Sequence, residues 1–188
     1  MKKQYGFILK KQKKNSCKNK TSRGFLREVL KGDKMIFLTK RCIIRNFRYE
    51  DAEDLYEVLS SAEVMKYIEP VFDMEKTADF IKNAGLCEPP LVYAVEFNET
   101  EKVIGHLIFH SYENGGYEIG WVINKKYWGI GIANELTKRI IEYSKTLDIK
   151  SLIIEFDENQ TVSKHIAEKN GFVYEGKTDD LEIYRLML

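Results

Sequence analysis

The sequence predicts an α/β (α+β) protein, and three observations support this class. Segments rich in β-branched and aromatic residues alternate along the chain with segments of helical periodicity. The run Asn114-Gly115-Gly116 separates two apolar segments, as expected for a hairpin of antiparallel strands. Another apolar segment leads through a glycine pair, Gly129 and Gly131, directly into an amphipathic helix. A chain of 188 residues holds one such domain, two at most.

The part of the chain before the glycine pair is expected to contain one strand, two helices and three strands. Asp51, Glu53 and Asp54 place acidic residues in the first turn of the first helix, as the helix dipole prefers. Asp73 is expected to cap the second helix, which ends at Gly85. In chain order these elements span residues 41–47, 50–60, 73–85, 92–97, 103–110 and 117–123.

The part after the glycine pair is expected to form a helix over residues 132–147, then a strand, a short helix and two strands. The short helix should bury Val162, Ile166 and Ala167. It should end at Gly171, because helices often end on a left-handed residue and glycine adopts this conformation most easily. The three strands span residues 152–156, 172–175 and 182–188.

The glycine pair lies where a strand passes into a helix, which favours binding of an anion. Glycine has no Cβ, so the backbone at Gly129 and Gly131 can turn sharply and approach a ligand closely. The free N–H groups at the helix start and the positive end of the helix dipole suit a pyrophosphate. The P-loop pattern is absent, and Asn134 stands where the dinucleotide pattern Gly-x-Gly-x-x-Gly needs its third glycine.

The pattern that remains is a basic residue followed by x-x-Gly-x-Gly-x-Ala over residues 126–133. It resembles the coenzyme A pyrophosphate loop of the GNAT acyltransferase superfamily, and residues 127–133 resemble the branch with the ribosomal-protein N-terminal acetyltransferases. Residues 163–172, which end in Gly171-Phe172, resemble the fourth helix of that fold. The resemblance covers about residues 40–188 and implies a single mixed, mostly antiparallel sheet with helices on both faces.

The resemblance also implies acetyl-CoA as the cosubstrate. Relatives usually have Arg or Gln at the position of Lys126, and an Asn three residues before Ser163. This chain has Gln160 there, so either Gln160 or the preceding Asn159 takes that role. Trp121 either lines the cleft or is a half-buried aromatic of the sheet. By resemblance, the coenzyme-binding residues are Trp121, Val122, Ile123, Lys126, Gly129, Ile130, Gly131, Ile132, Ala133 and Asn159.

Acetyl transfer from a thioester to an amine needs a base for the amine proton and an acid for the leaving thiolate. Ser163 matches a serine proposed as the acid in relatives, although serine at a helix start often bonds only to backbone. Many relatives use a tyrosine where this chain has Ala167. Glu118 is the candidate base, or else a cross-strand partner, and Glu155 is a second candidate. Neither motif contains a cysteine, which favours direct transfer without a covalent intermediate.

Composition indicates a globular protein of a reducing compartment, and we expect it in the cytoplasm. No run approaches the roughly 18 apolar residues that a membrane span requires. The three cysteines, Cys17, Cys42 and Cys87, are scattered, which argues against a disulfide framework. The three histidines lack companions at ligand spacing, so we expect no metal. We expect no membrane partner, and a chain that is a monomer or a homodimer.

Residues 1–34 differ from the rest of the chain in charge. They hold twelve Lys or Arg against two acidic residues, whereas the remainder holds 18 basic and 27 acidic residues. We expect a disordered extension followed by an acetyltransferase domain over residues 35–188. The extension is either an arm for nucleic acid or another anionic surface, or it lies upstream of a true start at Met35. We favour the start at Met35, because Lys31-Gly32-Asp33 can be encoded by a sequence that resembles a bacterial ribosome-binding site.

The sequence therefore predicts an acetyl-CoA-dependent N-acetyltransferase that acts on a primary amine. The alternative is a non-catalytic acyl-CoA-binding or nucleic-acid-associated protein of the same fold. Candidate acceptors are a protein N-terminus, a polyamine and an aminoglycoside. Acidic residues crowd the two helices that border the acceptor in relatives, so they indicate a cationic acceptor unless they only form a solvated face. These residues are Glu50, Asp51, Glu53, Asp54, Glu57, Asp73, Glu75 and Asp79.

Overall fold

The computed structural model describes residues 35–178 and 180–188, so the extension expected over residues 1–34 lies outside the described residues. The strands are β1 (Met35–Leu38), β2 (Cys42–Arg45), β3 (Val92–Phe97), β4 (Lys102–Ser111), β5 (Gly116–Ile123), β6 (Ser151–Asp157), β7 (Val173–Thr178) and β8 (Leu181–Met187). The α-helices are α3 (Ala52–Leu59), α4 (Ala62–Met65), α5 (Met74–Phe80), α6 (Ile132–Lys145) and α7 (Thr161–Lys169). Short helical turns are η1 (Tyr49–Asp51), η2 (Ile81–Gly85), η3 (Glu113–Gly115) and η4 (Lys125–Tyr127).

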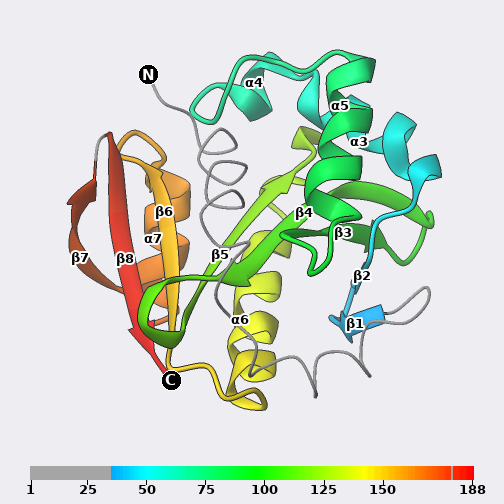
Figure 1. Ribbon diagram of the computed structural model, residues 1–188. Coiled ribbons are helices and arrows are strands. Elements are labelled where there is room, and N and C mark those ends of the chain that lie inside the picture. Colours follow the sequence, from blue (N-terminus) through cyan, green and yellow to red (C-terminus); the bar gives the residue numbers. More distant parts are fainter. Residues whose placement is uncertain (1–34, 179) are drawn as a thin grey trace.

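Within the described residues the strands form a single sheet in the order β1-β2-β3-β4-β5-β6-β8-β7 (Figure 1). β5 and β6 are parallel, and the other neighbouring pairs are antiparallel. The hairpin expected at Asn114-Gly115-Gly116 is present between β4 and β5, with Asn114 and Gly115 at positive φ. The predicted mixed, mostly antiparallel sheet is thus confirmed.

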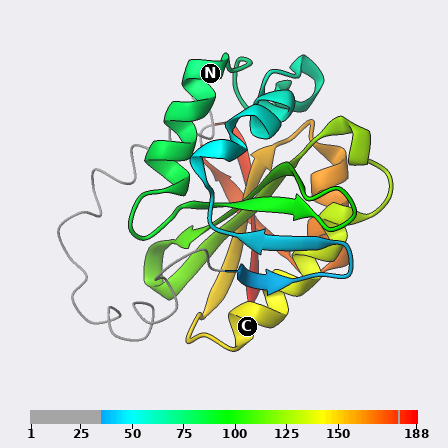
Figure 2. The ribbon, with the colours of Figure 1, turned by 90° about the vertical axis from the view of Figure 1, so that its right-hand side faces the viewer.

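The helices cover both faces of the sheet, as predicted (Figures 1 and 2). α6 and α7 pack on one face through a core that includes Leu136, Ile140 and Ala167. α3, α4 and α5 cover the other face with a second core that includes Leu55 and Phe80. We call these two faces the α6–α7 face and the α3–α5 face. Side chains alternate along each strand, so neighbouring residues of β5 and β6 point to opposite faces.

β5 and β6 separate after a short stretch of pairing (Figure 1). Among the described residues, their register covers only Gly116–Glu118 of β5 and Ser151–Ile153 of β6. Beyond this point β5 stays paired with β4 up to Ile123, while β6 stays paired with β8 up to Asp157. Each strand follows its other neighbour, so the ends of β5 and β6 diverge and leave backbone groups on both sides of a gap.

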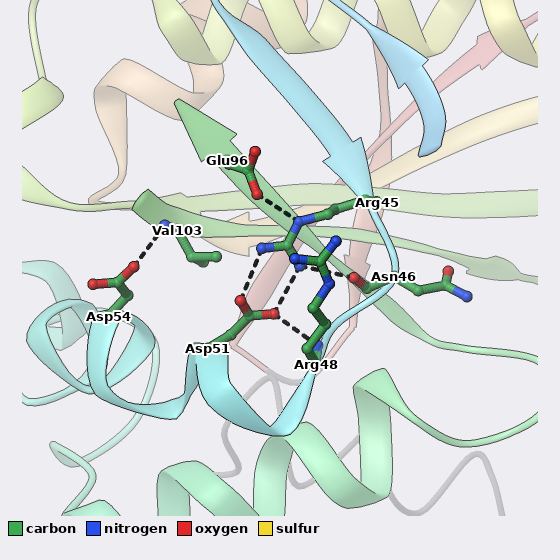
Figure 3. Close-up of polar contacts among 7 residues, drawn as sticks. All are labelled: Arg45, Asn46, Arg48, Asp51, Asp54, Glu96 and Val103. Carbon is green, nitrogen blue, oxygen red and sulfur yellow. Dashed lines mark hydrogen bonds and ion pairs between the residues drawn. The ribbon is translucent and has the colours of Figure 1, made fainter. Parts of the chain in front are cut away.

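A buried arginine fixes the start of α3 to the sheet (Figure 3). The Arg45 guanidinium, on β2, donates two hydrogen bonds of 2.8 Å to the Asp51 carboxylate and one of 2.6 Å to Glu96 on β3. Although burial disfavours the charge, these bonds raise the pKa of Arg45. The Asp54 carboxylate accepts from the Val103 N–H at 3.0 Å. Two of the acidic residues expected to serve the helix dipole therefore attach α3 to β2, β3 and β4.

Three local expectations need correction and two hold. The segment before β2 forms a strand of its own, β1, and the additional helix α4 lies between the two expected helices. Val162, expected to be buried in α7, is 71% exposed because it lies in the first turn on the side away from the sheet. The Asp73 side chain caps α5 by accepting from the Lys76 N–H, as expected. Gly171 follows α7 with a left-handed φ of 87°, also as expected.

Candidate active site

The glycine loop, residues 126–131, is held in place by contacts at the end of β5. The Asn124 side chain accepts a hydrogen bond from the Lys126 N–H at 3.0 Å and caps η4. The Trp128 indole N–H donates to the Ile123 carbonyl at 2.8 Å, and the Tyr127 ring packs against Phe97. These aromatic residues anchor the loop, so its backbone enters α6 in a defined direction.

The two glycines have the backbone conformation that the loop pattern predicted. Gly129 and Gly131 have φ values of 75° and 87°, in the left-handed region that other residues rarely adopt. Gly131 is the N-cap of α6, and no side chain caps it, so the first N–H groups of the helix face the loop. Ile132 is buried in the core and fixes the helix start, whereas Ile130 is 51% exposed. This helix start can accept an anionic group.

A groove runs between the diverging ends of β5 and β6. Among its lining residues, Trp121 and Phe156 belong to the α6–α7 face, whereas Val122 belongs to the α3–α5 face. Residues of both faces of the sheet therefore line the groove, at the gap between the strands. Its lining residues are Ile68, Gly120, Trp121, Val122, Ile154, Glu155, Phe156, Gln160 and Ser163.

The start of α7 borders this groove. Ser163, in the first turn of α7, is partly exposed and lines it together with Gln160. The Gln160 side chain also accepts from the Asp157 N–H at 3.0 Å, which ties the helix start to the end of β6. Asn159 is exposed, and its backbone and side-chain N–H groups both bond to the Asp157 carboxylate, at 2.9 and 2.8 Å. Of the two candidates for the family asparagine role, Gln160 is the one at the groove.

Buried titratable groups gather on the α3–α5 face where β5 and β6 part. Glu118, the last β5 residue paired with β6, is 1% exposed, and its Oε2 lies 3.4 Å from Nε2 of His110 on β4. The His110 Nδ1 lies 3.1 Å from the Ser111 carbonyl oxygen. Glu155 is buried on β6. Partial burial raises the pKa of Tyr112, and a hydrogen bond to Glu155 adds to this effect. Two carboxylates thus lie beside the gap, one from each strand.

The remaining predicted residues have other contacts. The Lys126 ammonium, 74% exposed in its side chain, lies 3.1 Å from Glu57 of α3, so the glycine loop touches the helices of the opposite face. Ala133 and Ile132 form the first turn of α6. Val122 and Ile123 are buried. The Val122 backbone faces β4, and the Ile123 carbonyl accepts from the Trp128 indole, so of these two residues only the Ile123 N–H lies on the side of the gap.

The acidic residues of α3 are mostly engaged by basic groups. Asp51 is bound by Arg45, as described above, Asp54 lies 3.5 Å from the Lys102 ammonium, and Glu57 is bound by Lys126. Less of this charge is therefore available to attract a cationic acceptor than the sequence indicated. Glu155, in contrast, lines the groove itself, and Glu118 lies buried on β5 where this strand parts from β6.

Sequence reasoning did not anticipate the contact between Arg41 and the glycine loop. Arg41, in the turn between β1 and β2, donates from Nη1 to the Ile130 carbonyl at 2.7 Å. No local pattern around Arg41 could have indicated this contact, because it depends on β1 and β2 packing beside the start of α6.

The fold and this groove together define an acetyltransferase of the GNAT type. The chain belongs to the acetyltransferase (GNAT) domain family, whose profile matches residues 41–173. The uncharacterized N-acetyltransferase YnaD of Bacillus subtilis (strain 168) is 35% identical over 146 residues, which cover 76% of this chain and 85% of YnaD. The chain is therefore a GNAT-family N-acetyltransferase.

Solved structures agree with this assignment. A GNAT-family acetyltransferase from Bacillus anthracis is 29% identical, with a TM-score of 0.72, over 80% of this chain and 96% of that one. RimL, a ribosomal L7/L12 α-N-protein acetyltransferase, was solved in complex with coenzyme A. It is 17% identical, with a TM-score of 0.69, over 82% of this chain and 98% of its own, and this likeness concerns the fold alone.

Two further findings concern only residues 35–178 and 180–188. None of the helices there is long and apolar enough to cross a membrane. No cluster of three or more His, Cys, Asp and Glu residues in those ranges could hold a metal ion. The expectation that the protein needs no metal stays a prediction.

Proposed function

We propose that this N-acetyltransferase transfers the acetyl group of acetyl-CoA directly to a primary amine bound on the α3–α5 face. The observation that carries the proposal is the groove between β5 and β6, which is lined by Ser163 from one side of the sheet and by Glu155 from the other. A thioester inserted from the α6–α7 face and an amine from the α3–α5 face would meet in this gap.

The residues present fit both ends of the coenzyme, the pyrophosphate and the pantetheine arm. The glycine loop and the uncapped start of α6 suit a pyrophosphate, because they offer backbone N–H groups and the positive end of a helix dipole. The edge of β5 beyond its pairing with β6, where the Trp121 backbone and the Ile123 N–H face the gap, offers backbone groups to the amide-containing pantetheine arm. Gln160, at the groove, suits the role of the family asparagine better than Asn159 does.

We assign the proton transfers to groups on opposite faces of the sheet. Glu118, on the α3–α5 face, takes a proton from the ammonium form of the acceptor, directly or through water. The neutral amine then attacks the thioester carbonyl carbon, a C–N bond forms, the nitrogen releases its second proton to water, and the C–S bond breaks. The Ser163 hydroxyl, in the first turn of α7, gives its proton to the departing thiolate, and the helix dipole eases the charge that develops there. Solvent restores both groups.

The buried carboxylates also support a positively charged acceptor. An amine that enters as an ammonium ion finds Glu118 and Glu155 beside the gap, one on each diverging strand. Burial strengthens the attraction between opposite charges, because the effective dielectric is lower than in water. We therefore assign the cationic preference to these two residues rather than to the acidic surface of α3. A protein N-terminus, a polyamine and an aminoglycoside remain the acceptor classes to compare.

An acceptor screen tests the proposal. The purified full chain is incubated with acetyl-CoA and amines of each class, and release of free thiol is followed together with the mass of the products. We expect thiol release that depends on the amine, equal amounts of acetylated amine, and no acetylated protein when the amine is omitted. Binding of acetyl-CoA without thiol release by any amine would favour a non-catalytic role.

The same assay tests the charge of the acceptor. For a cationic amine, kcat/KM should fall as salt is raised, whereas a neutral amine of similar size should change little. Equal salt dependence for both amines, or a preference for the neutral one, would mean that Glu118 and Glu155 do not take part in acceptor recognition.

A further inference from the structure

The side chain of Arg41 links the turn between β1 and β2 to the start of α6. Its Nη1 donates to the Ile130 carbonyl at 2.7 Å, and its Nε donates to Oε2 of Glu135 at 2.8 Å. The backbone N–H of Arg41 donates to the other oxygen, Oε1, of Glu135 at 2.9 Å. One residue therefore holds both a carbonyl of the glycine loop and an acidic side chain in the first turn of the helix.

The contact with Ile130 sets the direction of the next peptide N–H. In a trans peptide the C=O and N–H groups point in opposite directions. Because the Ile130 carbonyl points to Arg41, the N–H of Gly131 points away from it, out of the loop. The left-handed φ of Gly131, 87°, permits this arrangement, and a Cβ there would lie 3.7 Å from Nη2 of Arg41.

The contacts with Glu135 balance a charge that would oppose an anionic ligand. Glu135 lies in the first turn of α6, where its carboxylate competes with a bound anion for the helix N-terminus. Burial opposes its ionisation, but hydrogen bonds from Thr39 and Arg41 outweigh this effect and lower the pKa of Glu135. The carboxylate is thus charged, and the Arg41 guanidinium, 2.8 Å away, compensates it.

We propose that Arg41 is a positioning residue for the coenzyme phosphates: it orients the Ile130–Gly131 peptide and neutralises Glu135, so that the start of α6 can receive a pyrophosphate. This inference rests on the proposed binding of acetyl-CoA at the glycine loop. The β1–β2 turn lies outside the loop pattern, yet through Arg41 it then contributes to the affinity for ligands that carry a pyrophosphate.

The test compares two probes, CoA and S-acetylpantetheine, which carries a thioester but no pyrophosphate. Calorimetry with Arg41→Met should show a dissociation constant for CoA raised about tenfold, as expected for the loss of a charge-assisted contact. Binding of S-acetylpantetheine should be unchanged. Adding Glu135→Gln to Arg41→Met should recover about threefold of the lost affinity, because the uncompensated charge is then absent. Arg41→Lys keeps the charge but cannot contact Ile130 and Glu135 at the same time as a guanidinium does, so its dissociation constant for CoA should lie between those of wild type and Arg41→Met.

Arg139→Met is the matched control. The Arg139 guanidinium also ties β1 to α6, by donating from Nε to the Leu38 carbonyl at 3.0 Å, but it lies in the middle of the helix, away from the loop. The Arg139→Met variant should lower the melting temperature as Arg41→Met does and leave CoA binding unchanged. Equal CoA affinity in wild type and Arg41→Met, or equal losses in both arginine variants, would overturn the inference. If the wild-type chain itself does not bind CoA, the proposed function fails first.

Discussion

The coenzyme side and the proposed acceptor side of this acetyltransferase are built from different parts of the chain. The coenzyme side consists of the glycine loop and the start of α6, which are neighbours in sequence, and it offers mainly backbone N–H groups. The acceptor side consists of side chains from β4, β5 and β6, with His110, Glu118 and Glu155 as its main polar groups. A site made of backbone in one continuous segment leaves a sequence pattern, whereas a site made of side chains from several strands does not.

The difference also predicts how each side responds to substitution. A backbone site is sensitive to changes that alter loop conformation or add charge, and it tolerates exchange of most side chains. A side-chain site is sensitive to loss of single functional groups. Ser163 lies between the two, because it borders the groove from the start of α7. The first three predictions below run from the largest expected effect on binding or rate to the smallest, and the fourth concerns stability.

Gly131→Asp should affect only the coenzyme side. Aspartate tolerates the left-handed φ of 87° better than most residues, so the fold should persist. Its carboxylate beside the pyrophosphate should raise the dissociation constant of CoA by about 100-fold or more through like-charge repulsion. Calorimetry measures this constant. Gly131→Asn is the control, because asparagine has the shape of aspartate without the charge, and it should lose much less affinity for CoA. Unchanged affinity in both variants would mean that the phosphates bind elsewhere.

Glu118→Gln should affect only the acceptor side. If Glu118 is the base, kcat should fall by about 100-fold, while the dissociation constant of acetyl-CoA stays the same. The remaining activity should rise with pH, because the amine then loses its proton without help. Glu155→Gln removes the second carboxylate and should mainly raise the KM of the acceptor. A kcat within threefold of wild type for Glu118→Gln would leave Glu118 as a structural partner of His110.

Ser163→Ala tests the boundary between the two sides. The hydroxyl acts only as charge develops on sulfur, so kcat should fall with little change in the KM of acetyl-CoA. We expect a loss of about tenfold, below the roughly 100-fold lower end for general acid catalysis, because water can replace a partly exposed hydroxyl. Ser163→Thr keeps a hydroxyl and should retain most of the rate. A loss of less than threefold in the single-turnover rate would mean that Ser163 has only a structural role at the helix start.

The fourth prediction concerns stability on the α3–α5 face. His106, on β4, is fully buried beside Phe80, and burial lowers the pKa of His106 from 6.5 to about 3. Above pH 6.5 the histidine is neutral in both states; between pH 6.5 and 3 only the unfolded chain binds the proton. The free energy of unfolding should therefore fall by up to about 1.4 kcal/mol per pH unit in this window.

Urea unfolding between pH 7 and pH 4 measures this slope. His106→Gln should flatten it relative to wild type, even if the variant is less stable at neutral pH. His165 is exposed on α7, so His165→Gln should keep the wild-type slope. Equal slopes in all three proteins would mean that His106 does not stay neutral in the folded chain.

Much of the fold could be predicted because its signals are local. The hairpin at Asn114-Gly115-Gly116, the cap at Asp73 and the helix end at Gly171 each depend on a few neighbouring residues, and each is present. Burial was harder to predict. Val162 was expected in the core from its apolar side chain alone, but the first turn of α7 directs it to solvent.

The sequence by itself determined the conformation of the glycine loop, because the left-handed turns at Gly129 and Gly131 depend on the absence of a Cβ at those positions. Only the tertiary structure decided which charges remain available at the site. Three carboxylates form ion pairs with basic residues from other elements, most of them distant in sequence: Asp51 with Arg45, Glu57 with Lys126, and Glu135 with Arg41. Coulomb attraction depends on distance in space, and a sequence pattern contains distance only along the chain.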